Sequence, residues 1–227
     1  MNGVVTTMSS TQLIKPAAPS NYWLMQLSDR FLAALALCLL SPLLAVIALA
    51  VVVGSGWPVL FKQERVGQRG KLFQLLKFRT MRTGKSGPSI TARGDSRITG
   101  VGRFLRKFKL DELPQLWNVV RGEMSLVGPR PEVPQFVDMN NPVWRSVLQV
   151  RPGITDPASI AFRNEEELLA KAADPISFYE KSVLPAKLAL NLAYLDRKCF
   201  WLDIKVILQT AWCAIFPGTQ EIKDTGI

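Results

Sequence analysis

The most apolar part of the chain is an uncharged run from Phe31 to Val53. A core helix carries a one-sided apolar stripe, whereas this run is apolar all round, which is typical of a helix embedded in a membrane. A signal-peptide core has only roughly 7–15 apolar residues, so the run is too long to be one. We therefore predict a membrane helix over residues 29–56.

A Ser-Pro pair, Ser41-Pro42, lies at the middle of this run. Pro42 has no N–H group and its ring clashes with the carbonyl of Cys38, so the helix must kink or break there, and the Ser41 hydroxyl can satisfy a freed backbone group. Each arm of about eleven residues reaches about 16 Å, half of a hydrocarbon core of about 30 Å. Two geometries stay open, a re-entrant hairpin and a kinked spanning helix, and these residues alone slightly favour spanning.

Around this helix the pattern changes twice. Residues 1–28 are rich in Ser, Thr, Ala and Pro and are expected to be loose, whereas residues 57–227 form the remaining domain. Residues 61–81 are expected to form short strands about a Gly67–Gly70 turn. Residues 83–97 are polar and contain glycine, as in a loop.

Two further segments have helical periodicity. Apolar side chains recur at Val101, Phe104, Leu105 and Phe108 with basic residues between them, which predicts a cationic amphipathic helix over 101–109. A second set begins at Leu113, and because proline belongs in a first turn, that helix is expected to begin near Asp111. The mostly apolar segment 199–216 is expected to be an interfacial or core helix. The fold class is therefore α+β, helix-dominated, with a small β-hairpin and amphipathic interfacial helices.

The charge is concentrated in one place. The formal net charge is +10, and residues 62–109 hold fourteen basic side chains against Glu64 and Asp95. Such a segment calls for an anionic partner such as nucleic acid, phospholipid headgroups or a polyphosphate. Because the basic cluster follows the apolar run directly, the positive-inside rule places this part of the chain on the cytoplasmic side.

Composition also excludes some chemistry. The chain has no histidine, so Ser-His-Asp triads and His-ligated zinc are impossible. Its three cysteines form no Cys-x-x-Cys pair, which argues against a thiolate metal site. The sequence also lacks the GxxxxGK[ST] phosphate loop and an Asp-x-Asp pair.

The candidate chemistry is an acidic pair within the basic segment. Asp111-Glu112 lies at the predicted helix start, where N–H groups and the helix dipole favour anions. Taken alone, the pair also fits an ordinary N-cap. Its basic neighbours Lys77, Arg79 and Arg106 instead suggest phosphoryl chemistry with a divalent ion. Arg130, held between prolines in the Gly-Pro-Arg-Pro segment 128–131, either aims its guanidinium at a phosphate or occupies a rigid surface turn.

Four segments together resemble a known family: FKQERVG, LKFRTM, DSRITGVGRFLRKFKLDELPQLWNVVRGEMSLVGPRPEVP and RPGIT. They are similar to the bacterial sugar transferases, the monotopic polyprenyl-phosphate phosphoglycosyl transferases, from about Ser28 to Phe216. The resemblance implies transfer of a sugar-1-phosphate from a UDP-sugar to polyprenyl (undecaprenyl) phosphate, with release of UMP and with Mg²⁺. It implies a phospho-sugar–aspartyl intermediate in the first membrane step of bacterial glycan assembly. It also implies a re-entrant helix broken at Ser41-Pro42, against the slight preference for spanning.

The resemblance further assigns roles to residues. Asp111 would be the nucleophile and Glu112 its partner, and the two together would hold the metal. The substrate-binding residues would be Lys77, Arg79, Arg106, Pro129 and Arg130. The implied location is the bacterial inner membrane, among its lipids, with the catalytic domain on the cytoplasmic face, no nucleic-acid partner and room for a homodimer.

The chain departs from the family pattern in its second half. Asn191 stands where relatives carry an aspartate, and Asp174 is an alternative replacement for that group. The acidic stretch Glu165–Glu167 is expected to be a solvated helix face, with contact to the sugar as the alternative. The sequence leaves open which UDP-sugar, which glycan pathway and which oligomeric state apply. The rival function is a non-enzymatic, membrane-anchored basic module that binds anionic lipid or nucleic acid.

Overall fold

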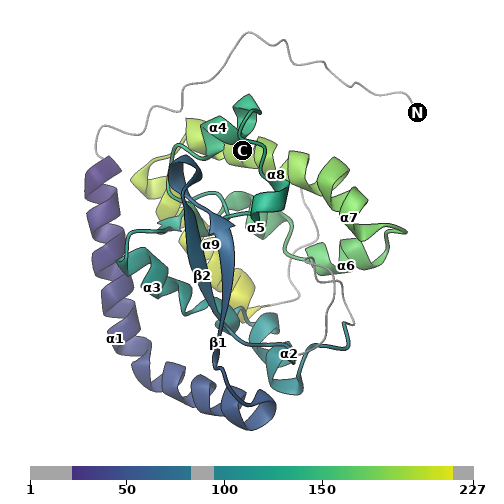
Figure 1. Cartoon of the computed structure of the whole chain (residues 1–227). Helices are drawn as coiled ribbons and strands as arrows, with labels where there is room; N and C mark the ends of the chain where they lie inside the picture. Colours follow the sequence, from purple (N-terminus) through teal and green to yellow (C-terminus); the bar gives the residue numbers. More distant parts are fainter. Residues whose placement is uncertain (1–21, 83–94, 217–227) are drawn as a thin grey trace.

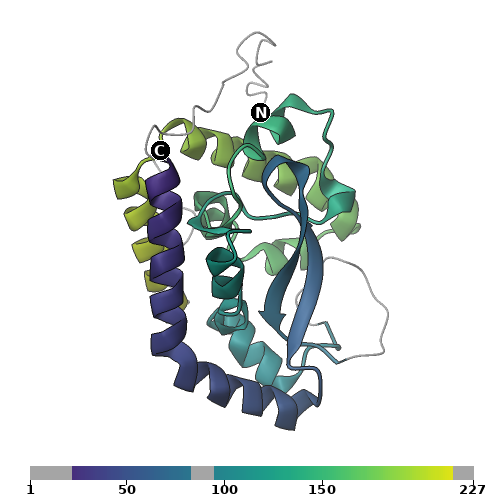
Figure 2. The ribbon, with the colours of Figure 1, turned by 60° about the vertical axis from the view of Figure 1, so that its left-hand side comes forward.

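A computed structural model describes residues 22–82 and 95–216 (Figure 1). Residues 1–21 and 83–94, which hold most of the predicted loose segment 1–28 and of the predicted loop 83–97, lie outside the described residues, as do residues 217–227. A long bent helix borders the molecule, and a β-hairpin and a group of shorter helices fill the space beside it (Figures 1 and 2). Within the described part, the fold is the helix-dominated α+β arrangement that the sequence predicts.

The long helix is α1, Tyr22–Ser55. It begins seven residues before the predicted membrane helix 29–56, because residues 22–28, which were expected to be loose, are already helical. Distant backbone groups hold this first part in place: the Arg151 amide donates to the Tyr22 hydroxyl at 2.9 Å, and the Leu126 amide donates to Asp29 at 3.3 Å. The helix therefore gains tertiary contacts that local composition does not reveal.

Helix α1 changes direction about halfway along its length (Figures 1 and 2), and the proline inside it is Pro42. The Ser41 hydroxyl donates to the Cys38 carbonyl at 2.8 Å. This is the carbonyl that would accept the N–H group that Pro42 lacks. The predicted compensation by Ser41 is confirmed, and it lets the helix bend without leaving that carbonyl bare.

Both arms of α1 pack on the rest of the molecule. Ala33 in the first arm joins a cluster with Leu116 and Val119, and Ile47 and Val51 in the second arm join a cluster with other apolar side chains. The opposite faces are exposed, and only 11% of the most apolar 18-residue window is buried. By length and composition, α1 is the one helix in the described residues that could cross a membrane. So much exposed apolar surface calls for an apolar partner.

The strands form two small sheets. Strands β1 (Leu60–Val66) and β2 (Leu72–Phe78) pair antiparallel about a turn that includes the short helix η1 (Gln68–Gly70), which confirms the predicted hairpin. Strands β3 (Ser125–Val127) and β4 (Gly153–Thr155) form a short parallel pair. The hairpin ends near the site described below, and Lys77 is its next-to-last residue.

The first two α-helices after the hairpin are short. The predicted cationic helix is α2, Gly100–Lys107, with Thr99 as its N-cap. The next α-helix, α3 (Gln115–Val120), begins four residues later than predicted. Asp111 and Glu112 lie instead in a 3-10 turn, η2 (Leu110–Glu112), because Lys109 adopts a left-handed conformation (φ 57°) that ends the preceding helical path. The acidic pair is therefore not at an α-helix N-terminus.

The remaining elements follow in chain order and build the main core. They are η3 (Pro134–Phe136), α4 (Pro142–Val147), α5 (Pro157–Ala161), α6 (Glu165–Ala170), α7 (Pro175–Phe178), η4 (Tyr179–Val183), α8 (Leu184–Asp196) and α9 (Phe200–Ile215). The largest apolar cluster joins α4, α8 and α9 through residues such as Trp144, Tyr194 and Val206. The predicted helix over 199–216 is confirmed as α9.

Arg79 ties the end of α1 to the end of the hairpin. Its guanidinium donates to the carbonyls of Trp57 at 2.7 Å and Ser55 at 2.5 Å, and also to the carbonyl of Gly56. The residue is only 4% exposed. The last carbonyls of a helix lack partners inside it and carry its negative dipole end, so a buried arginine is well suited to satisfy them. We therefore expect Arg79 to support the structure rather than to bind a substrate.

Replacing Arg79 should destabilise the protein. The variant Arg79→Gln loses three bonds from a charged donor and leaves buried carbonyls bare, which should cost about 3 kcal/mol of unfolding free energy. Thermal unfolding of the detergent-solubilised protein measures this, with Arg103→Gln, an exposed arginine on α2, as the matched control. Equal unfolding temperatures for the two variants would contradict this role.

Candidate active site

Glu112 is the centre of a cluster of opposite charges. Lys77 Nζ donates to Glu112 Oε1 at 3.0 Å and Arg130 Nη1 donates to Oε2 at 3.0 Å, while Arg130 Nη2 also donates to Oε1. Burial by itself raises the pKa of the Glu112 carboxyl, but Arg130 and Lys77 hold it well below its usual range. Glu112 is therefore a fixed anion that joins β2, η2 and the Gly-Pro-Arg-Pro segment.

Asp111, which precedes Glu112 in the chain, has a carboxyl oxygen that no cation among the described residues binds. It is only 6% exposed, and its Oδ1 atom has no hydrogen-bond partner in the part of the chain that the structure describes. Burial raises the pKa of the Asp111 carboxyl, and the negative charge of Glu112 raises it further. An anion without direct partners is costly to bury, so its ionised form is reactive towards an electrophile that enters the site.

Asn118 positions Lys77 beside this pair. It is fully buried on α3, where its Oδ1 accepts from the Leu76 amide at 3.1 Å and its Nδ2 donates to the Gln74 carbonyl at 2.8 Å. These bonds fasten the end of β2 to α3. Sequence reasoning missed this residue because one asparagine inside an apolar helix carries no motif.

Asp156 positions Arg130, as Asn118 positions Lys77. It is fully buried, and its two oxygens accept from the backbone amides of Arg130 at 2.8 Å and Ser159 at 2.5 Å. It thereby caps α5 and holds the Gly-Pro-Arg-Pro segment against it. Pro129 contributes its carbonyl, which accepts from the Gly153 amide at 3.1 Å, and lies beside Arg130 in the wall of a shallow pocket. Sequence reasoning missed Asp156 as well.

Arg106 lies on the side of Asp111, but it is engaged elsewhere. Its Nε donates to Thr80 Oγ1 and its Nη1 donates to Glu166 Oε1, both at 2.9 Å. Its positive charge lowers the pKa of Asp111, which places it within electrostatic reach of that carboxyl. The neighbouring Glu165 pairs with Lys187 of α8. The acidic stretch of α6 is thus not only a solvated face, because it neutralises two cations near the site.

The structure separates the predicted site residues into three groups. Asp111, Glu112, Lys77 and Arg130 lie together, and the interpretation of Arg130 as part of a mere surface turn is wrong because its guanidinium binds Glu112. Arg106 and Pro129 flank this cluster. Arg79 does not reach it, since its guanidinium is bound to carbonyls at the end of α1. The prediction that Arg79 binds substrate therefore gains no support from its position.

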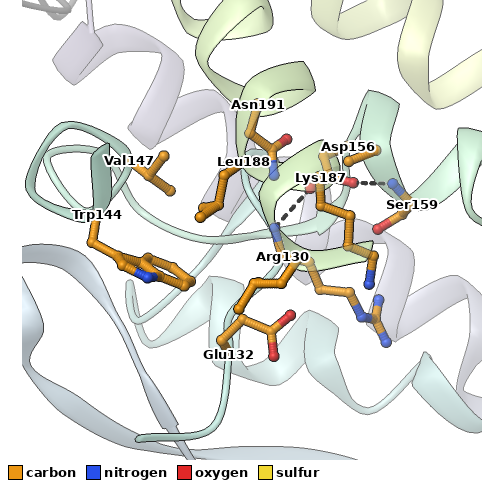
Figure 3. Close-up of a pocket in the computed structure, with 11 residues that line it drawn as sticks. Arg130, Glu132, Trp144, Val147, Asp156, Ser159, Lys187, Leu188 and Asn191 are labelled. Carbon is orange, nitrogen blue, oxygen red and sulfur yellow. Dashed lines mark hydrogen bonds between the residues drawn. The ribbon is translucent and has the colours of Figure 1, made fainter. Parts of the chain in front are cut away.

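Asp174 and Asn191, the two candidates for the position where relatives carry an aspartate, lie in different parts of the structure. Asp174 caps α7, where its carboxylate accepts from the Ile176 amide at 3.1 Å and the Ser177 amide at 3.2 Å. Asn191 of α8 instead lines a pocket beside Arg130 (Figure 3). Of the two, Asn191 is therefore the one that lies beside Arg130.

The acidic pair has features that suit a magnesium ion. The described residues contain no group of three or more His, Cys, Asp or Glu side chains of the kind that encloses a metal. Mg²⁺ does not need one, because it often takes one or two carboxylates and completes its shell with waters and substrate phosphates. The unpartnered Asp111 Oδ1 is such a ligand, whereas both Glu112 oxygens already accept from cations. The pair thus fits a metal that a diphosphate brings with it.

Comparison with known proteins decides the family. Residues 20–217 match the family described as bacterial sugar transferase. The chain belongs to this family. It is 38% identical over 213 residues to the UDP-glucose:undecaprenyl-phosphate glucose-1-phosphate transferase of Caulobacter vibrioides, covering 88% of this chain and 75% of that protein.

Two further bacterial sugar transferase relatives are similar over most of this chain. An Escherichia coli K12 protein of the same name is 37% identical over 223 residues, which cover 93% of this chain and 44% of that protein. The UDP-N-acetylgalactosamine-undecaprenyl-phosphate N-acetylgalactosaminephosphotransferase of Aeromonas hydrophila is 35% identical over 187 residues, 80% of this chain and 41% of that protein. The chain therefore spans less than half the length of these two relatives.

The raised pKa of Asp111 and the lowered pKa of Glu112 predict different effects of substitution on the free energy of unfolding. Glu112→Gln removes the counter-charge of Lys77 and Arg130 and should cost about 2 kcal/mol, less than for a fully buried pair because both cations are partly exposed. Asp111→Asn should leave the protein at least as stable, because folding raises the pKa of this carboxyl and so disfavours its charge at neutral pH. Chemical denaturation measures both, and an equal loss in the two variants would contradict this contrast.

Proposed function

We propose that this bacterial sugar transferase moves a sugar-1-phosphate from a UDP-sugar to a polyprenyl phosphate, such as undecaprenyl phosphate, and releases UMP. The observation that carries the proposal is the buried Asp111 carboxylate, unpartnered at Oδ1, beside a Glu112 that fixes two cations. A nucleophile must keep a free oxygen, and an anionic substrate needs fixed positive charge around it. The relatives named above carry this reaction in their names.

The proposed reaction has two steps. A carboxylate oxygen of Asp111 attacks the β-phosphorus of the UDP-sugar, and the bond from that phosphorus to the bridging oxygen breaks, so UMP leaves with the bonding electrons. The sugar-phosphate is then esterified to Asp111. In the second step an oxygen of the polyprenyl phosphate attacks the same phosphorus and the Asp111 carboxylate leaves. Each step exchanges one P–O bond for another, so no redox partner is needed.

The barrier in both steps is repulsion between anions. Phosphoryl transfer depends chiefly on positioning and on electrostatic stabilisation. Arg130 and Lys77 are held in place by Glu112, and Arg106 lies within electrostatic reach of Asp111. A Mg²⁺ ion held by a carboxylate oxygen of Asp111, with Glu112 beside it, would supply further neutralisation of the phosphate charge. The protein side chains orient the phosphates and keep the attacking oxygen free.

The bent helix suits a lipid acceptor. If α1 spanned the bilayer, one arm would lie in the far leaflet, away from a domain on one side. Instead, both arms pack on the domain that follows α1, the first arm on α3 and the second on the region of α2. This supports a re-entrant helix in the bacterial inner membrane, with the catalytic domain on the cytoplasmic face as the basic segment predicts. A lipid phosphate at the headgroup level would then meet a soluble nucleotide sugar.

The non-enzymatic alternative explains fewer of these features. A basic module for anionic lipid or nucleic acid needs exposed cations, whereas Lys77 and Arg130 are turned onto a buried carboxylate. It also has no use for an unpartnered acid at Asp111. The chain's membership of a transferase family also favours an enzyme over a binding module.

Asp111→Asn should abolish the reaction. The amide is a poor nucleophile, so UMP release with polyprenyl phosphate should fall by on the order of 10⁴-fold or more. With donor alone, intact-mass analysis of the wild-type protein should show one added sugar-phosphate, and peptide mapping should place it on Asp111. A panel of UDP-sugars in the wild-type assay identifies the donor.

The same assay can overturn the proposal. Asp111→Glu preserves charge but displaces the carboxylate and should also fail. Full turnover by Asp111→Asn, or an adduct on another residue, would exclude Asp111 as the nucleophile. Lack of UMP release by the wild-type protein with every UDP-sugar in the panel would exclude the reaction itself.

Two arginines on α2 provide a graded test of the phosphate contacts. Arg106→Ala should lower kcat/KM by on the order of 10²-fold, as removal of one stabilising donor does in other enzymes. Arg103→Ala, an exposed arginine on the same helix, should have little effect. Steady-state UMP release measures both, and equal losses would show that only the overall positive charge of α2 matters.

A further inference from the structure

Lys109 is a cation beside the acidic pair to which the family resemblance assigns no role. It lies between α2 and η2, two residues before Asp111, and it is exposed. Two backbone bonds fasten it to the site: its amide donates to the Arg106 carbonyl at 3.2 Å, and its carbonyl accepts from the Glu112 amide at 3.2 Å. The point from which its side chain starts is therefore fixed relative to the acidic pair.

The charge of Lys109 reaches both carboxylates. Burial and the charge of Glu112 raise the pKa of the Asp111 carboxyl, and Lys109 opposes this rise. Its effect on that carboxyl is larger than the effect of Arg106. For Glu112, burial raises the pKa, and Arg130 and Lys109 are among the cations that lower it. Lys109 is therefore close enough to act on negative charge that gathers at Asp111.

The other cations of the site are already engaged. Lys77 and Arg130 share the carboxylate of Glu112, and Arg106 donates to side-chain oxygens of two other residues. The ammonium group of Lys109 has no hydrogen bond or ion pair with any of the described residues. Its donors and its charge are thus available, within this part of the chain, for an incoming anion.

The backbone of Lys109 has a conformation that disfavours a side chain. Its φ of 57° and ψ of 20° are left-handed, a region that glycine enters without a steric penalty and lysine does not. Residues other than glycine that are held in such conformations cluster at functional sites. A lysine at this position is better explained by a use for its ammonium group than by the needs of the turn.

We infer that Lys109 binds a phosphate group of a substrate beside Asp111. The inference rests on the proposed function, which brings two phosphate-bearing substrates to this carboxylate in turn, the UDP-sugar and the polyprenyl phosphate. Lysine suits either one, because its ammonium group is a point charge on a flexible stem and does not need the fixed fork geometry of arginine. Lys109 supplies positive charge that no carboxylate among the described residues has already taken up.

The test treats the two substrates separately. Lys109→Gln, Lys109→Gly and Lys109→Arg are compared in the full chain, and Lys107→Gln, at an exposed lysine of α2, is the matched control for the loss of one charge. One arm measures the binding of UDP and the formation of the Asp111 adduct at increasing concentrations of UDP-sugar alone. The other arm measures transfer from the preformed adduct to increasing amounts of polyprenyl phosphate.

Lys109→Gln and Lys109→Gly should each lower the affinity for the phosphate that Lys109 binds about tenfold or more, as the loss of a hydrogen bond to a charged group does. Lys109→Arg should keep most of the affinity, because the charge stays. The loss should shrink at high salt, since an exposed charge is screened. Lys109→Gly should unfold at about the wild-type temperature, because glycine accepts the left-handed backbone, so its defect would not come from misfolding.

Each outcome assigns or removes the phosphate contact. A defect in the first arm assigns Lys109 to the donor diphosphate, a defect in the second assigns it to the lipid phosphate, and a defect in both shows that the two phosphates use it in turn. Wild-type behaviour of Lys109→Gln in both arms, or an equal loss in Lys107→Gln, would overturn the inference and leave the transferase function intact. If the wild-type protein forms no adduct, the proposed reaction fails. A raised Kd for UDP in Lys109→Gln would then still show the contact, and an unchanged Kd would exclude it.

Discussion

The site depends on one carboxylate shared by two cations. Glu112 binds Lys77 of the hairpin, 35 residues earlier in the chain, and Arg130 of the Gly-Pro-Arg-Pro segment, 18 residues later. Each partner would be costly to bury alone, and each is satisfied by the other. Asn118 and Asp156 hold the backbones that carry these two cations. The geometry around Asp111 is therefore set before any substrate arrives.

The same arrangement explains why adjacent acids behave differently. Glu112 accepts the hydrogen bonds from both cations, whereas Asp111 Oδ1 has no hydrogen-bond partner among the described residues. Burial therefore raises the pKa of the Asp111 carboxyl, while the cations lower that of Glu112. A well-satisfied carboxylate would be a weak nucleophile. The protein thus concentrates its stabilising contacts on one residue of the pair and leaves the other available for the proposed chemistry, which is the usual trade between stability and activity at a functional site.

Sequence reasoning reached the parts of the molecule that have a local signature. The hairpin follows from a turn between strand-like segments, and the Ser41 bond follows from the missing N–H of Pro42. The errors arose where distant contacts decide. Arg79 lies in a basic motif, yet its partners are carbonyls at the end of a helix some 22 to 24 residues earlier in the chain. Asn118 and Asp156 carry no pattern at all, because their importance depends on which backbone amides the fold brings to them.

The pocket and the acidic pair come from different stretches of chain. Lys77, Asp111 and Glu112 precede residue 113, whereas the helices that form the pocket wall, α4, α5 and α8, begin at Pro142 or later. Only Arg130 and its neighbours belong to both. Substitutions in α4, α5 and α8 can therefore alter the surroundings of Arg130 while Lys77, Asp111 and Glu112 stay as they are.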